Sequence, residues 1–188
     1  MKFRSLEIEN FGLFSGTHVV DLTPKSSEKN QPIILIGGKN GAGKTTFLEA
    51  LRTCLYGRQA FGERLTNKAY MTCLEDRIHR PKDTSKIVKG SRLTLLFDYA
   101  IEGVERQYEI TRSWRRTNNT QTPVQEQLSI LVDGEPLSDI AEPYWGDFIE
   151  ELVPFGVSEL FFFDGEKIKS MAENKTAKAS LSTAMKSM

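Results

Sequence analysis

The stretch from Gly38 to Thr46 constrains the fold of this chain more than any other. It reads GKNGAGKTT and fits the phosphate-binding loop template G-x-x-x-x-G-K-S/T. Glycine lets the backbone curl until successive N–H groups point at phosphate oxygens, and Lys44 can then reach the β- and γ-phosphates as a mobile catalytic cation. Thr45 offers a hydroxyl to Mg²⁺, so the stretch predicts a site for ATP and Mg²⁺. The residues expected to bind the nucleotide are Gly38, Lys39, Asn40, Gly41, Ala42, Gly43, Lys44, Thr45 and Thr46.

The residues on either side of this loop fit the same template. The apolar run Ile33 to Ile36 is typical of a parallel strand that is buried on both faces. After the loop, Phe47, Leu51 and Leu55 recur at helical spacing, and Gly57 is a natural helix end. The phosphate loop is therefore expected between a buried strand and a helix.

The remaining periodicity predicts an α/β fold with a mixed parallel and antiparallel sheet. Residues 2–9 and 17–22 read as a hairpin, with Phe3, Leu6 and Ile8 on the inner face. From residue 91 to residue 132 apolar residues alternate with polar ones, which predicts three antiparallel strands. Further helices are expected within residues 60–80 and 142–152.

Composition sets few limits on the partners of the protein. The sequence has 25 Lys and Arg residues and 25 Asp and Glu residues, so overall charge predicts no partner. A basic cluster of Arg112, Arg115 and Arg116 around Trp114 could contact a DNA backbone, and a charged strand end that blocks edge pairing explains it equally well.

The cysteines and the hydropathy bear on the compartment. Cys54 and Cys73 have no metal-ligand spacing, and Cys54 is expected to be a small core residue. This cysteine usage fits a reducing cytoplasm, and no apolar run is long enough to span a bilayer. We therefore expect a cytoplasmic protein.

The segment LFFFDGE, from Leu160 to Glu166, is the second candidate for chemistry, and its role stays open. In one interpretation Asp164 ends an acidic strand and is a catalytic and metal-binding residue that holds Mg²⁺. In another, the segment corresponds to the turn where ABC and SMC-like domains place a glutamine near the γ-phosphate. A plain core strand explains Phe161 to Phe163 but gives Asp164 and Glu166 no role.

The order of the segments resembles the N-terminal half of SMC-like, SbcC-type ABC ATPases over nearly the whole chain. The opening LEIENFGLFSG resembles the first strand and turn of that family, with Gly12 where the family usually has a basic residue. The QGE turn of the family appears here as Asp164, Gly165 and Glu166. By the same resemblance, Arg4 or Ser5 and the turn at Asn10 are expected to approach the base or ribose.

Within that superfamily the chain is most similar to the DndD family, the ATPases of bacterial DNA phosphorothioation, also called DNA sulfur modification. The similarity is carried by GVSELFFFDGEKI, from Gly156 to Ile168, together with GGKNGAGKTTFLEALRTCLYG, from Gly37 to Gly57. The resemblance implies that ATP binding and hydrolysis drive the engagement of two heads on DNA. It also implies a head-to-head homodimer and, as partners, other sulfur-modification or restriction proteins.

Several motifs of a complete SMC-like head are not found in the sequence, namely an LSGG-type signature, an apolar strand ending in Asp-Glu and a switch histidine. His18 and His79 are isolated and are expected to be ordinary surface or turn residues. We therefore expect residues 1–166 to be an incomplete N-terminal ATPase lobe, from a fragment or a split gene. Residues 167–188 are expected to start a coiled-coil or linker helix.

Three functional alternatives remain open. In the first, the lobe is an ATPase that is inactive without a C-terminal lobe, in the same protein or in a second chain, and acts in sulfur modification or in SbcC-type DNA repair. The second is a self-contained phosphotransferase that uses Asp164 and an arginine lid near Arg77 to Arg80. The third is a non-catalytic DNA-binding or assembly module.

Overall fold

The computed structural model describes residues 1–23, 34–62, 64–83, 85–119, 122–156, 158 and 162. Residues 1–152 form one compact unit, and the residues from Val153 onward belong to a second unit. Asp164, Glu166 and the helix expected over residues 167–188 lie outside the described residues, so the division at residue 166 stays a prediction. No helix in the described part is long and apolar enough to cross a membrane.

The first unit is built on a six-stranded sheet in the order β2-β1-β3-β4-β5-β6, in which every neighbouring pair is antiparallel. The predicted hairpin and the three predicted strands from residue 91 onward are confirmed. The strands are β1 (Lys2–Glu9), β2 (Thr17–Asp21), β3 (Gly90–Ile101), β4 (Val104–Arg116), β5 (Val124–Val132) and β6 (Glu135–Pro136).

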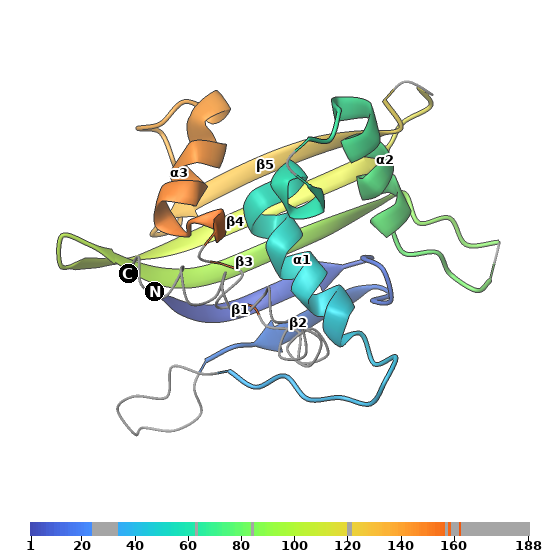
Figure 1. The fold of residues 1–188 in the computed structure, drawn as a ribbon, viewed down its shortest axis with the longest axis horizontal. Helices are drawn as coiled ribbons and strands as arrows, with labels where there is room; N and C mark the ends of the chain where they lie inside the picture. Colours follow the sequence, from blue (N-terminus) through green and yellow to red (C-terminus); the bar gives the residue numbers. More distant parts are fainter. Residues whose placement is uncertain are drawn as a thin grey trace, which may run out of the picture. The chain divides into compact units, whose positions relative to one another are not determined.

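The helices of this unit pack on one face of the sheet, where α1 crosses the central strands (Figure 1). The helix after the phosphate loop and its end at Gly57 are confirmed. One short helix, Asn67–Arg77, lies within residues 60–80 as expected, and a 3-10 helix, Gly57–Phe61, begins before that range. The helix expected over residues 142–152 is divided into a 3-10 turn and α3. The helices are α1 (Lys44–Tyr56), η1 (Gly57–Phe61), α2 (Asn67–Arg77), η2 (Glu142–Tyr144) and α3 (Trp145–Leu152).

The core lies between the helices and the inner face of the sheet. Leu6, Leu95, Ile110 and Ile130 stand opposite one another on four successive strands, and all of them are buried. Side chains alternate between the two faces of a strand, so apolar residues at every second position produce this layer. The register of the sheet is thus set by the same alternation that predicts its strands from the sequence.

The buried parallel strand expected at Ile33 to Ile36 is not formed within the described chain. Residues 34–39 carry no strand, and Leu35 is 92% exposed. An apolar run indicates that a segment avoids water, whereas a strand also needs a neighbouring backbone for its N–H and C=O groups. All the described strand pairs are antiparallel, so the expected parallel component of the sheet does not appear among them.

Arg112 and Trp114 lie in the core, so neither interpretation left open for the basic cluster, DNA contact or an exposed strand end, applies to these two residues. They occupy the same face of β4 as Tyr108 and Ile110, and the Trp114 indole donates a hydrogen bond to the carbonyl of Leu74 in α2. Both side chains are therefore sealed from solvent by the helices. Arg115 and Arg116 remain exposed at the end of the strand.

Arg112 joins four elements. Its guanidinium donates to the carboxylate of Glu126 on β5 at 2.6 Å and to the carbonyl of Cys54 near the end of α1 at 3.2 Å. The hydroxyl of Tyr70, from α2, donates to the same Glu126 oxygen at 2.6 Å. Burial alone would lower the pKa of Arg112, but Glu126 and Tyr70 raise it above its ordinary value, so the residue stays charged. The C-terminal end of α1 is thereby fixed to the sheet.

Cys54 is buried on the inner face of α1, as predicted. Burial raises the pKa of its thiol to about 12, so the group remains protonated at neutral pH. Its role is packing rather than chemistry.

Candidate nucleotide-binding site

The phosphate loop leads directly into α1, as the sequence predicts. Gly43 stands at the start of the helix with φ of 93°, a left-handed conformation that glycine adopts readily, and Phe47 N–H donates to its carbonyl. A further backbone bond, from Ala42 N–H to Lys39 C=O, closes the preceding turn. The N-terminal end of an α-helix directs its first N–H groups and the positive end of its dipole outward, so this end suits an anion.

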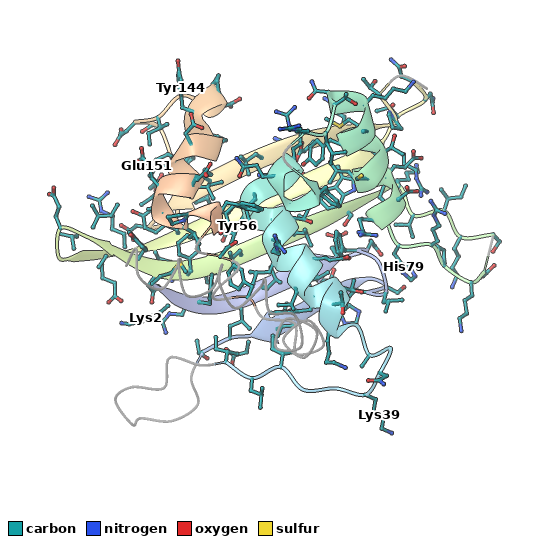
Figure 2. The ribbon with its side chains drawn as sticks, viewed as in Figure 1. Lys2, Lys39, Tyr56, His79, Tyr144 and Glu151 are labelled. Atoms are coloured by element: carbon teal, nitrogen blue, oxygen red, sulfur yellow. The ribbon has the colours of Figure 1, made fainter. Side chains whose placement is uncertain are left out.

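The ammonium group of Lys44 lies folded over the loop. It donates to the carbonyl of Gly38 at 2.9 Å and to the carbonyl of Lys39 at 3.1 Å. The ammonium group is therefore held at the loop backbone, where it can donate to any acceptor that enters the loop. In contrast, the side chain of Lys39 points away from the protein, so this residue offers the loop only its backbone (Figure 2).

The donor set at this end of α1 fits a magnesium ion that is held mainly by a nucleotide. Thr45 lies in the first turn of α1, next to Lys44. Mg²⁺ keeps several waters and takes only one or two protein oxygens besides phosphate, so one hydroxyl is a sufficient protein contribution here. Within the described residues no group of three or more His, Cys, Asp or Glu side chains could hold a metal alone. The expected second ligand, Asp164, is outside the described chain.

A turn from the far N-terminus lies against the loop. This turn, residues 10–16, connects β1 and β2, and the ring of Phe14 lies beside Gly43. Gly12 has φ of 54°, and a Cβ atom built on it would lie 2.6 Å from the Thr46 methyl group. The family that this chain resembles usually has a basic residue at this position. This chain requires a glycine here, because there is no room for a side chain.

We expect Gly12→Ala to weaken nucleotide binding and to lower the free energy of unfolding by about 1 to 3 kcal/mol, since it combines backbone strain with a clash against Thr46. Thermal unfolding and nucleotide titration measure the two effects. Gly16→Ala is the matched control, because Gly16 has φ of 73° and no atom within 4 Å of an added Cβ. The double variant Gly12→Ala with Thr46→Ser removes the clashing methyl group and should recover the binding; no recovery would contradict the role of this contact.

The turn is also attached to the end of α2. Gly12 N–H donates to Arg77 C=O at 2.7 Å, and His79 N–H donates to Asn10 C=O at 2.7 Å. The His79 ring is hydrogen-bonded through Nδ1 to the carbonyl of Gly12 at 2.8 Å. His79 thus bonds a turn carbonyl, as expected for a turn residue, but its position beside the phosphate loop could not be inferred from an isolated histidine in the sequence.

A hollow of about 510 Å³ opens beside this turn. The residues that line it are Gly12, Leu13, Asp76, Ile78, His79, Arg80 and Lys82. They come from two segments far apart in the sequence, which explains why no motif indicated the hollow.

Other residues considered from the sequence serve structural roles. The guanidinium of Arg4 is paired with the buried carboxylate of Asp98, and its expected approach to the base stays a prediction. Asn10 closes its own turn, because its side-chain oxygen accepts from Gly16 N–H. The arginines considered for a phosphotransferase lid are ion-paired, Arg77 with Glu49 and Arg80 with Asp76.

Comparisons with known proteins agree with this geometry. A family model described as an AAA domain matches residues 5–188. A component of the nuclease SbcCD from Treponema pallidum is 45% identical over 58 residues, which are 31% of this chain and 5% of that protein. The DNA double-strand break repair Rad50 ATPase of Methanosarcina acetivorans is 27% identical over 141 residues, which are 75% of this chain and 11% of that protein.

A probable DNA double-strand break repair Rad50 ATPase of Aquifex aeolicus is 24% identical over 140 residues, again 11% of that protein. The chain thus spans only 5% to 11% of the length of these curated relatives. A solved structure, from work on ATP-driven dimerization and DNA-stimulated activation of SMC ATPases, superimposes with a TM-score of 0.58 at 15% identity. The superposition covers 98% of this chain and 99% of that one. It shows that the fold is that of an SMC-like ATPase head.

Proposed function

Because this chain belongs to the AAA domain family, we propose that it is the ATP-binding lobe of an SMC-like ATPase that acts on DNA. The phosphate loop is the main support for this proposal. The loop leads through Gly43 into α1, and the Lys44 ammonium group is already folded over it. In this role the loop backbone and Lys44 hold the phosphates, and the Thr45 hydroxyl orients a magnesium ion. The bound Mg²⁺ neutralises charge on the phosphates, and the protein positions them.

We also propose that a second, C-terminal lobe completes the ATPase. The apolar run at Ile34 to Ile36 leads into the phosphate loop and is exposed, which suits a segment that pairs with another lobe. Hydrolysis needs further groups that stabilise the transition state opposite the phosphate loop, and a lobe with a signature motif and an acidic strand would supply them. In this arrangement ATP draws two heads together.

ATP turnover tests this arrangement directly. The chain should hydrolyse ATP slowly alone and faster when it is mixed with a C-terminal lobe that carries the missing motifs. The stimulation should vanish when Lys44→Ala is introduced. Rapid Lys44-dependent turnover by the chain alone would contradict the two-lobe arrangement and favour a self-contained phosphotransferase.

Contact with DNA is part of the proposal, and a basic rim at one end of the sheet supports it. The segment that precedes β3 joins the end of β4 there, because Arg116 N–H donates to Lys89 C=O. Exposed cations that neutralise phosphates give binding that weakens steeply with salt. The exposed cations of this rim are Lys86, Lys89, Arg115 and Arg116.

The finer proposal is that the ATPase acts in DNA phosphorothioation, with other sulfur-modification proteins as partners. It is supported by the sequence run from Gly156 to Ile168. The alternative is double-strand break repair, which is favoured by the names of the two Rad50 relatives. The Lys44→Ala variant in the host distinguishes the two functions. Loss of iodine-sensitive phosphorothioate from the DNA supports phosphorothioation. Sensitivity of the host to double-strand breaks, with an unchanged phosphorothioate content of its DNA, supports double-strand break repair.

A further inference from the structure

The turn of residues 10–16, which lies against the phosphate loop, is joined to the C-terminal end of α2. Gly12 N–H donates to Arg77 C=O at 2.7 Å, and Phe11 forms a β-bridge with Ile78. Both Phe11 and Ile78 are buried, so this junction belongs to the core. Figure 1 shows the end of α2 beside the turn between β1 and β2. The position of α2 therefore decides how the turn meets the start of α1.

The side chain of Arg77 joins the same end of α2 to α1. Its Nη2 atom donates to the Glu49 carboxylate at 3.1 Å, and Glu49 lies one helical turn after Thr45. The guanidinium also lies over the ring of Phe61, 5.9 Å from its centroid, within the range of a cation–π contact. The two charged side chains are 37% and 40% exposed. One residue thus holds the turn through its backbone carbonyl and α1 through its side chain.

The turn has little freedom where it meets the loop. A Cβ atom on Gly12 would lie 2.6 Å from the Thr46 methyl group, and the Phe14 ring lies 3.4 Å from the position of a Cβ atom on Gly43. Thr46 and Gly43 both belong to the phosphate-loop stretch. Because these contacts are close, a shift of the turn relative to α1 either displaces the loop or opens a gap beside it.

We propose that Arg77 is a positioning residue for the phosphate loop. Its pair with Glu49 fixes the end of α2 on α1, and the turn attached to α2 then holds the loop in the conformation that receives phosphates. The inference rests on the proposed ATP-binding function and adds a residue that acts on the loop from outside the motif. A binding site needs its groups held within about 0.5 Å, so loss of such a support lowers the affinity for the ligand.

Removal of the Arg77 side chain tests this role. Arg77→Met keeps the backbone carbonyl that binds Gly12 but lacks the cation that pairs with Glu49. Calorimetry measures the affinities of the whole chain for Mg·ATP and Mg·tripolyphosphate, at a temperature where circular dichroism shows each variant to be folded. Both affinities should fall about fivefold, the upper range for a partly exposed ion pair. Arg77→Lys, which retains a cation, should stay within about twofold of the unaltered chain.

The comparison of the two ligands locates the effect. Tripolyphosphate has the phosphates of ATP and no nucleoside. An equal loss of affinity for both ligands is therefore expected if Arg77 acts on the phosphate loop. A loss for Mg·ATP alone would overturn the proposal, because the turn would then act only on the nucleoside part of the ligand.

Two glutamates provide a matched pair of variants. Glu49 of α1 pairs with Arg77, whereas Glu75, which lies on α2 two residues before Arg77, pairs with Arg116 of β4 at 3.6 Å. The side chains of both pairs are similarly exposed, at 33% to 40%. Glu49→Ala should lose affinity for both ligands as Arg77→Met does, and Glu75→Ala should change it by less than about twofold. Equal losses in the two glutamate variants would contradict a specific role of the Arg77 pair.

A double variant shows whether Arg77 acts through the turn. Gly12→Ala already displaces the turn from Thr46, so adding Arg77→Met to it should lower the affinity by less than about twofold further. A full fivefold loss in both backgrounds would overturn the proposal, because independent effects add.

The remaining failures are distinguishable. A lower melting temperature of Arg77→Met with unchanged affinities overturns the positioning role, because the pair with Glu49 would then only stabilise the fold. Binding of neither ligand by the unaltered chain overturns the proposed function itself.

Discussion

Replacement of Lys44 by alanine is expected to lower the affinity for Mg·ATP at least about a hundredfold. The ammonium group lies over the loop at 2.9 and 3.1 Å from two backbone carbonyls, so it can exchange these for phosphate oxygens with little movement. Hydrogen bonds to charged groups contribute about 1.5 to 3 kcal/mol each, and a hundredfold change in affinity corresponds to about 2.7 kcal/mol. Titration with a fluorescent nucleotide would measure the loss.

Lys39→Ala is the matched control for this result. Lys39 belongs to the same loop and carries the same charge, but its side chain points away from the protein (Figure 2). Its removal should change the affinity for Mg·ATP by less than about threefold. If both variants lose affinity equally, general positive charge near the loop, rather than the folded ammonium of Lys44, accounts for binding.

The second large effect concerns stability. Arg112→Met should lower the free energy of unfolding by about 3 to 5 kcal/mol, because it leaves Glu126 without its cation in a site where that side chain is 16% exposed. It also removes the donor to the Cys54 carbonyl at the end of α1. Denaturant unfolding of the two proteins measures the difference.

A surface pair of nearly the same length provides the control. Lys2 and Glu105 approach to 2.7 Å, but their side chains are 65% and 53% exposed, so Lys2→Met should cost less than about 1 kcal/mol. Adding Glu126→Gln to Arg112→Met removes the stranded charge and keeps an acceptor for Tyr70, so part of the loss should be recovered. Equal effects of Lys2→Met and Arg112→Met would show that burial of the pair is unimportant.

Much of the sheet could be predicted from the sequence because local periodicity determines it. The position of Arg112 follows from the same rule: it stands two residues from Ile110 and two from Trp114, on the buried face of β4. Its charge left two exposed roles open, a DNA contact or a charged strand end, and the buried side chain fits neither. A charged side chain at an inward position calls first for a buried partner of opposite charge, and Glu126 is that partner.

Two features could not be predicted from local sequence. The apolar run at Ile34 to Ile36 indicates burial but not the segment that buries it. The hydrogen bond between His79 and Gly12 joins positions 67 residues apart in the chain. Local sequence periodicity does not predict contacts between residues so far apart. The phosphate loop itself was predictable because its chemistry needs fixed residue types at fixed spacing, whereas the hollow beside it depends on how two distant turns meet.

The order of the strands in the sheet bears on how the protein folds during synthesis. β1 lies between β2 and β3 in the sheet, and the phosphate loop with α1 and α2 separates β1 from β3 in the chain. The β3–β4–β5 meander needs only short connections and can form early, whereas closing the long segment between β1 and β3 costs more entropy. The β1–β2 hairpin therefore waits for residues that are synthesised much later. The turn of residues 10–16, which lies against the phosphate loop, is positioned only when β1 pairs with β3. The protein should therefore become able to bind nucleotide only after most of the sheet has formed.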